Sequence, residues 1–156
     1  MLLLANVART RDEAREQLVR SVTSGAALEK FRAMIGAQGG EVGVVENPSR
    51  LPRARLNEDL LAPRAGYVQE VDALGVALAA LRLGAGRAKA EDKVDPAVGI
   101  DALVKIGEPV EAGARLCRIH ANDETALAEA KVMLAKAIVI GEKLVAAPTL
   151  VGEVLG

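Results

Sequence analysis

The sequence predicts an α+β protein: an N-terminal αα-hairpin, a linker, and then a small antiparallel β-sheet or barrel-sandwich (a lipoyl-like hammerhead) with flanking helices. Two patterns predict this class. Apolar residues recur at helical spacing near both ends of the chain, and short apolar segments separated by glycine fill residues 102–121. Apolar residues make up 51% of the 156 residues, which is enough to build a folded core.

The N-terminal part predicts two consecutive helices. In the first, Ala14, Leu18 and Val22 recur every four residues, and the helix ends near Ser24. The second begins at a cap on Ser24, stops at a glycine pair, and carries one apolar stripe made of Ala27, Phe31, Met34 and Ile35. Because each helix has a single apolar face, two such helices need a further partner to close a core.

Residues 44–63 predict a linker that runs over the surface. Three prolines and alternating charges interrupt any regular apolar period in this stretch. A strand is expected next in residues 66–73, followed by a helix over residues 72–86. This helix should end at Gly84 and turn one apolar stripe inward, made of Leu74, Ala77, Leu78 and Leu81.

The C-terminal part predicts antiparallel strands and one strong helix. The short segments 102–107, 109–113 and 114–121 read as strands, with Gly107 and Gly113 at turn positions that need positive φ. A helix follows over residues 122–141, capped by Asn122 or Asp123, with one inward face made of Leu127, Ala130, Leu134 and Ala137. The tail, residues 143–156, adds an edge strand, since Pro148 removes one ladder donor.

Charge and cysteine content exclude several classes of protein. The 20 Lys and Arg residues nearly cancel the 21 Asp and Glu residues, so no strong field attracts nucleic acid or an anionic membrane. The single cysteine cannot form a disulfide framework, and the opening residues MLLLANVART lack the pattern of a signal peptide. No apolar run approaches the roughly 20 residues that cross a bilayer. We therefore expect a cytoplasmic protein without nucleic-acid or membrane partners.

One glycine-rich stretch is a candidate anion contact. Gly84 and Gly86 precede Arg87, so backbone N–H groups and a guanidinium lie close together in the chain. The stretch lacks the G-x-G-x-x-G fingerprint and follows a helix instead of opening one. We expect the two glycines to end the helix and Arg87 to pair with Asp92 or Asp95 across the loop, and contact with an anion is the alternative.

The motif Cys117-x-x-His120 does not predict a metal centre. It supplies two ligands where zinc needs three or four, and on an alternating strand the two side chains point to opposite faces. No nucleophile is placed beside His120, the only histidine, by any recognisable motif. We expect a structural histidine at a strand end, and no catalytic, cofactor-binding or metal-binding residue in this chain.

Lys93 carries the alternative interpretation, a non-catalytic carrier or binding module with a lipoyl- or biotinyl-like barrel. The stretch EDKVDP is similar to a lipoyl hairpin, but it precedes the G-E-P-V turn instead of following it. The place where a carrier lysine belongs holds Asn122 and Asp123. Without an amine at that place no acyl group can be attached.

Four phrases in order carry a resemblance to a known family: SGAALEKFRAMIGAQGG (24–40), AGYVQEVDALGVALAALRLGAGR (65–87), DPAVGI (95–100) and VKIGEPVEAGARLCRIHAND (104–123). Together they resemble the C-terminal third of the pyrimidine-nucleoside phosphorylase and thymidine phosphorylase family. The resemblance implies phosphorolysis of pyrimidine nucleosides to free base and (deoxy)ribose 1-phosphate, with inorganic phosphate as co-substrate, by a homodimer. The family's phosphate and pyrimidine motifs lie upstream of the part that this chain resembles.

The resemblance also implies a division of the chain. Residues 1–43 would be a helical hairpin of the family's large α/β domain, residues 44–63 a linker, and residues 64–156 the C-terminal α+β phosphorylase domain. We expect the chain alone to be inactive, to have the N-terminal part of the same enzyme as its partner, and to self-associate through its exposed apolar stripe. The barrel-like unit would be a structural cap, similar in shape to a lipoyl domain without its lysine.

Overall fold

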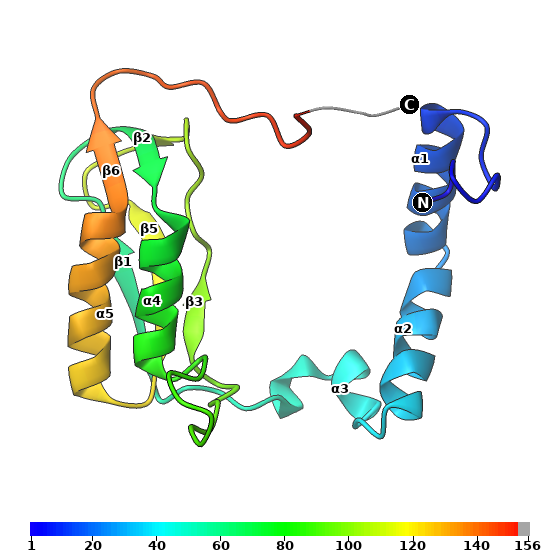
Figure 1. The fold of residues 1–156 in the computed structure, drawn as a ribbon, viewed down its shortest axis with the longest axis horizontal. Coiled ribbons are helices and arrows are strands. Elements are labelled where there is room, and N and C mark those ends of the chain that lie inside the picture. Colours follow the sequence, from blue (N-terminus) through cyan, green and yellow to red (C-terminus); the bar gives the residue numbers. More distant parts are fainter. Residues whose placement is uncertain (153–156) are drawn as a thin grey trace. The chain divides into compact units, whose positions relative to one another are not determined.

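A computed structural model describes residues 1–152 of the chain (Figure 1). The chain separates into two compact units, Met1–Leu51 and Pro52–Gly156. The first is helical, and the second combines two helices with two small antiparallel sheets. The predicted α+β class is therefore confirmed, whereas the described strands form two separate sheets and not one closed barrel. No described helix combines the length and the apolar character needed to cross a membrane.

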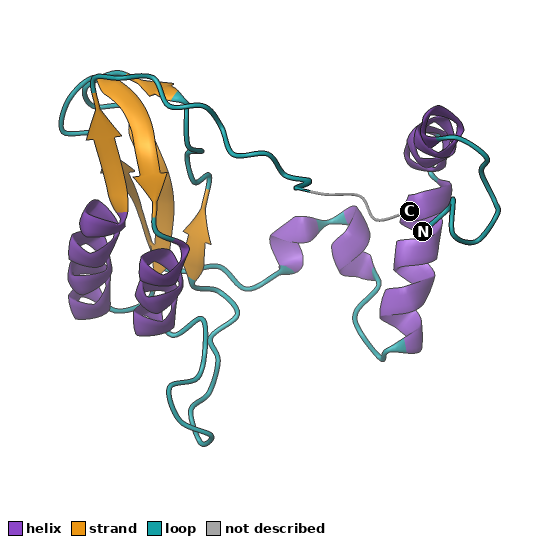
Figure 2. Ribbon diagram, turned by 45° about the horizontal axis from the view of Figure 1, so that its top comes forward, coloured by secondary structure: helices purple, strands orange, loops and turns teal. Residues whose placement is uncertain are grey.

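The first unit contains the two predicted helices, α1 (Arg11–Thr23) and α2 (Ala26–Ala37). The Thr10 hydroxyl caps α1 by accepting a hydrogen bond from the Glu13 N–H at 3.1 Å. Gly25, at φ 80°, turns the chain between the helices. In Figure 2, α1 is seen nearly end on and α2 from the side, so the two helices run in different directions and do not pack along their length. Neither helix has a buried residue.

The second half of the expected linker is a strand. Residues 43–50 form only a short helix, α3 (Gly43–Glu46), and a 3₁₀ turn, Pro48–Arg50. Beyond them, β1 (Leu56–Leu61) pairs along its whole length with β5 (Arg115–Ala121). The linker prediction is wrong here because β1 carries three polar residues and has little apolar signal of its own, so its long-range partner fixes it as a strand.

The second unit contains two three-stranded antiparallel sheets. The first has the order β1-β5-β3, with β3 at Gly99–Asp101, and the second the order β4-β2-β6. The strands of the second sheet are β2 (Gly66–Val71), β4 (Pro109–Val110) and β6 (Ile138–Gly141). The expected strand at residues 102–107 is irregular and ends in a turn at residues 106–107, and the chain pairs slightly earlier, at β3. Gly107 and Gly113 adopt the predicted positive φ, at 90° and 80°.

Two helices, α4 (Ala73–Leu83) and α5 (Glu124–Ala137), lie side by side over one face of the β1-β5-β3 sheet (Figures 1 and 2). The predicted inward face of α5 is confirmed, since all four of its residues are buried and Asp123 caps the helix. The helix ends at Ala137, earlier than expected, because the β-branched run that follows pairs with β2 as β6. The described tail, residues 143–152, contains no strand, and residues 153–156 of the expected edge strand lie outside the described part.

The inward face of α4 differs from the prediction. Leu74 and Leu78 are 66% and 45% exposed, whereas Ala79 and Leu83 are buried against the core. Ten of the eleven residues of α4 are uncharged, with Arg82 the exception, so the sequence offers two apolar faces. Packing against α5 and the sheet selects one of them. The other remains uncovered in the described chain.

Candidate functional site

The face of the β1-β5-β3 sheet opposite the two helices carries a group of polar and charged side chains. Strand alternation on β5 sends Cys117, Ile119 and Ala121 into the core under α4 and α5. Arg118 and His120 therefore point to the other face. The sequence expectation that Cys117 and His120 lie on opposite faces is confirmed.

The register of the sheet decides which side chains meet on this face. Asn57 of β1 and Gly99 of β3 both lie opposite His120. Asp59 of β1 and Asp101 of β3 lie opposite Arg118 in the same way. Because directly opposed residues of antiparallel strands face the same side, these side chains form one continuous polar surface.

Asp59 is held by two arginines. Arg118 Nε donates to Asp59 Oδ1 at 2.9 Å, and Arg115 Nη1 lies 3.8 Å from Asp59 Oδ2. The hydrogen bond from Arg118 is the largest cause that holds the pKa of Asp59 below its ordinary value. These charges satisfy one another, so this end of the face is a structural ion-pair group.

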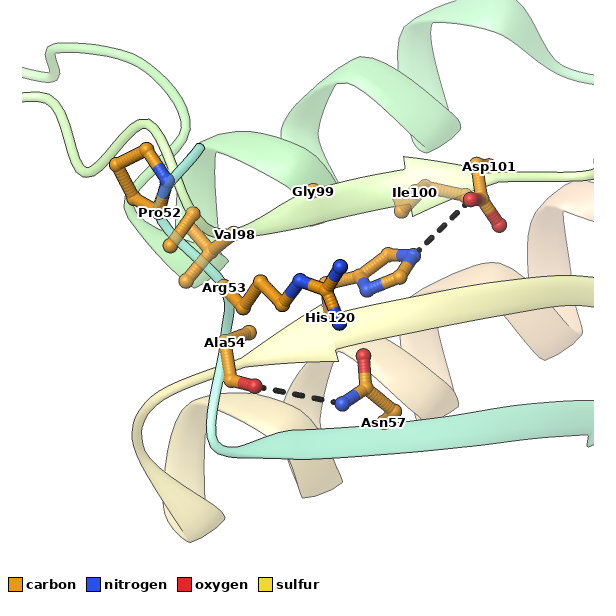
Figure 3. A pocket seen from close by; sticks show the side chains of 10 residues that line it. Pro52, Arg53, Ala54, Asn57, Val98, Gly99, Ile100, Asp101 and His120 are labelled. Atoms are coloured by element: carbon orange, nitrogen blue, oxygen red, sulfur yellow. Dashed lines mark hydrogen bonds and ion pairs between the residues drawn. The ribbon is translucent and has the colours of Figure 1, made fainter. Parts of the chain in front are cut away.

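A hollow of about 530 Å³ opens at the other end of the face, over His120 (Figure 3). Its polar lining consists of Arg53, Asn57, Asp101 and His120, and Pro52, Ala54 and residues 97–100 complete it. His120 Nε2 lies 3.1 Å from Asp101 Oδ2, and Asn57 Nδ2 donates to the Ala54 carbonyl at 3.3 Å. The lining offers hydrogen-bond donors and a guanidinium but no hydroxyl or thiol, so it is suited to binding and not to nucleophilic catalysis.

The sequence did not point to this hollow. Arg53 and Asn57 fall in the expected linker, and Asp101 lies before the expected strand. Only His120 was singled out, as a structural residue at a strand end. Strand register brings these four residues together from three segments, and no spacing in the sequence encodes that register.

The candidate stretch at Gly84, Gly86 and Arg87 takes the expected helix-ending conformation. Gly84 is the C-cap of α4 at φ 103°, and its carbonyl accepts the Asp95 N–H at 2.9 Å. Arg87 forms no ion pair with Asp92 or Asp95 in residues 1–152, so that expected pairing is wrong. Asp92 accepts instead from the Ala88 and Lys89 N–H groups. The anion contact at Arg87 stays a prediction.

Comparison with known proteins identifies the chain. Residues 67–141 match the model of the pyrimidine nucleoside phosphorylase C-terminal domain. Pyrimidine-nucleoside phosphorylases of Staphylococcus aureus strains USA300, COL and bovine RF122 are each 41% identical to this chain over 155 residues, 99% of its length. The chain belongs to the pyrimidine-nucleoside phosphorylase family. It spans 35% of the length of each of these relatives.

In this phosphorylase C-terminal domain, Asn122 and Asp123, which occupy the position where the sequence comparison with lipoyl domains expected a carrier lysine, have structural roles. Asp123 Oδ1 caps α5 by accepting the Ala126 N–H at 2.7 Å. Asn122 Nδ2 donates to Asp95 Oδ2, also at 2.7 Å. Lys93 is exposed in the irregular loop between α4 and β3, away from any strand-to-strand hairpin.

Proposed function

We propose that this chain is the structural C-terminal part of a pyrimidine-nucleoside phosphorylase. The whole enzyme would use inorganic phosphate to split thymidine or uridine into the free base and (deoxy)ribose 1-phosphate. The observation that carries the proposal is the 41% identity, along nearly the whole chain, with relatives named pyrimidine-nucleoside phosphorylase. The family resemblance further supports a cytoplasmic homodimer for the whole enzyme.

The chain alone would be inactive. In the described residues, the one thiol, Cys117, is fully buried, and the one histidine, His120, is paired with Asp101. Asp59, whose pKa is lowered, is held by arginines. None of these groups stands beside a nucleophile or a second base, as acid–base or covalent catalysis requires. Phosphate and nucleoside would bind to the part of the relatives that this chain does not span.

Uncovered apolar faces in each unit support a scaffold role. Phe31 and Met34 of α2 are each 48% exposed, and Leu74 and Leu78 of α4 are also exposed. An apolar helix face is normally covered by another element. We propose that the N-terminal part of the same enzyme covers these faces, and that residues 1–43 belong to its large α/β domain. In the absence of that part, self-association through the same faces is expected.

We also propose that the two sheets of the second unit are a lipoyl-like hammerhead that lacks the carrier lysine. The support is the pair of small antiparallel sheets with glycine turns at Gly107 and Gly113, and a cap residue at the lysine position. The competing function is a carrier modified at Lys93. Intact-mass measurement of the chain expressed with lipoyl and biotinyl ligases decides, because modification adds the fixed mass of the attached group.

Complementation tests the scaffold function. The chain is mixed with a separately expressed N-terminal part of a related phosphorylase, and phosphate-dependent release of thymine from thymidine is followed. We expect activity in the mixture and in neither part alone. A double substitution, Phe31→Ser with Met34→Ser, should abolish the rescue, because it makes the exposed face of α2 polar.

The matched control is Lys30→Ser, which changes an exposed residue of the same helix and should leave the rescue intact. Turnover by the isolated chain would contradict the structural role. Association of two folded parts without any activity would also contradict it, and would favour an independent binding role.

A further inference from the structure

The hollow over His120 is open on the side of Gly99, which has no side chain. Gly99 lies directly opposite His120 on β3, and a Cβ added there would meet no atom within 4 Å. On the other side of His120, the opposed residue of β1 is Asn57, whose amide reaches back to Ala54. The imidazole therefore lies in an open space bounded by polar groups.

Arg53 brings to this space a positive charge that is not paired with an acid. It lies just before β1 and points into the hollow toward His120 (Figure 3). It forms no ion pair with any residue of 1–152, whereas Arg115 and Arg118 of the same face both contact Asp59. The guanidinium is therefore available to a ligand.

Asp101 orients the histidine. Its Oδ2 lies 3.1 Å from His120 Nε2, so one ring nitrogen is occupied. Figure 3 shows the other ring nitrogen turned away from Asp101 and toward the side of Arg53. If the imidazole is protonated, Asp101 compensates its charge and the second N–H remains free to donate.

We propose that this hollow is a binding site for a small oxyanion, a carboxylate or phosphate group held between the Arg53 guanidinium and the His120 imidazole. The Arg53 fork donates charge-assisted hydrogen bonds that match the two oxygens of either ligand class, and the His120 imidazole donates a further one when both of its nitrogens carry hydrogen. The Asn57 amide, which has a second N–H, completes the donors. A cation is disfavoured because Asp101 lies 3.1 Å from His120 and Arg53 forms no ion pair in residues 1–152.

The single histidine makes the site directly observable. The imidazole C–H signals in the proton NMR spectrum of the chain come only from His120, because no other histidine is present. Titrations use sodium phosphate, sodium succinate and, as an ionic-strength control, sodium chloride. We expect phosphate or succinate to move the His120 signals saturably, and chloride to produce no saturable shift.

Arg53→Ala should weaken binding about 10-fold or more, as expected for loss of one charge-assisted contact, and Arg53→Lys should restore part of it. The control is Arg87→Ala, since Arg87 is another exposed arginine of the same unit and the alternative anion contact. Saturation by phosphate alone, by succinate alone or by both identifies the ligand class.

Two results would overturn the proposal. One is the absence of a saturable shift with both anions. The other is binding that Arg53→Ala leaves unchanged, whether or not Arg87→Ala weakens it. Arg53 is exposed, so its variants should keep the fold, and the fluorescence of Tyr67 in β2 checks this.

Discussion

Asn122 Nδ2 donates a hydrogen bond to Asp95 Oδ2 at 2.7 Å, and this contact joins two segments that are distant in the sequence. Asn122 Oδ1 also accepts the Arg55 N–H at 2.8 Å, at the entrance to β1. The Asp95 N–H donates to the Gly84 carbonyl at the end of α4. The side chain of Asn122 and the carboxylate and backbone N–H of Asp95 thus connect the entrance of β1, the end of α4 and the junction between β5 and α5.

Asp95→Asn should lower the free energy of unfolding at pH 7, by an amount that shrinks in acid. The hydrogen bond from the Ala97 N–H and then that from Asn122 hold the pKa of Asp95 below its ordinary value. A carboxylate whose pKa is lower in the folded chain than in the unfolded chain stabilises the fold at pH values above its unfolded pKa of about 4. This stabilisation is lost as the pH falls through the folded pKa. Urea unfolding followed by Tyr67 fluorescence measures both proteins from pH 7 to pH 3.

The difference in the free energy of unfolding between wild type and variant should disappear below pH 4. A difference that is the same at all pH values would show that the Asp95 charge does not cause the loss of stability. Asp12→Asn is the control, because Asp12 lies in the first unit and Tyr67 reports on the second.

Cys117 should be unreactive in the folded chain. It is fully buried, and burial is the main cause that raises the pKa of its thiol to about 11. Since the thiolate is the reactive form, labelling by a disulfide reagent at pH 8 should be about 100-fold slower than in the urea-unfolded chain. Absorbance of the released thiol follows the reaction. Equal rates in the two states would show that the strand core around Cys117 opens freely.

Gly107→Ala should destabilise the second unit more than Gly113→Ala. Both glycines have φ in the left-handed region, which costs an alanine about 1–2 kcal/mol. A Cβ at Gly107 would also lie 2.8 Å from the Val145 carbonyl oxygen, whereas one at Gly113 meets nothing within 4 Å. Urea unfolding measures both variants, and equal losses would mean that the tail segment at Val145 yields without cost.

The two leucine faces of α4 should differ in their contribution to stability. Leu83→Ala removes a side chain that is 8% exposed and should cost about 2–4 kcal/mol. Leu74→Ala removes one that is 66% exposed and should change stability by no more than about 0.5 kcal/mol. Tyr67-monitored unfolding of the isolated chain compares them. A larger cost for Leu74 would show that the face predicted from the sequence is the buried one.

Local patterns were sufficient for part of the fold. The α5 face at Leu127, Ala130 and Leu134, the cap at Asp123 and the glycine end of α4 all follow from spacing within a few residues. The helical period and the capping hydrogen bond act over one or two turns, so the sequence displays them directly.

By itself, the sequence determined the α+β class, the helices of both units, the opposite orientations of Cys117 and His120, and, through its ordered phrases, the phosphorylase family. Only the tertiary structure decided that residues 56–61 form a strand, which face of α4 is buried, and that Arg53 and Asp101 meet at His120. The physical reason is that sheet register and the choice between two apolar faces depend on partners far along the chain. No local period records those partners.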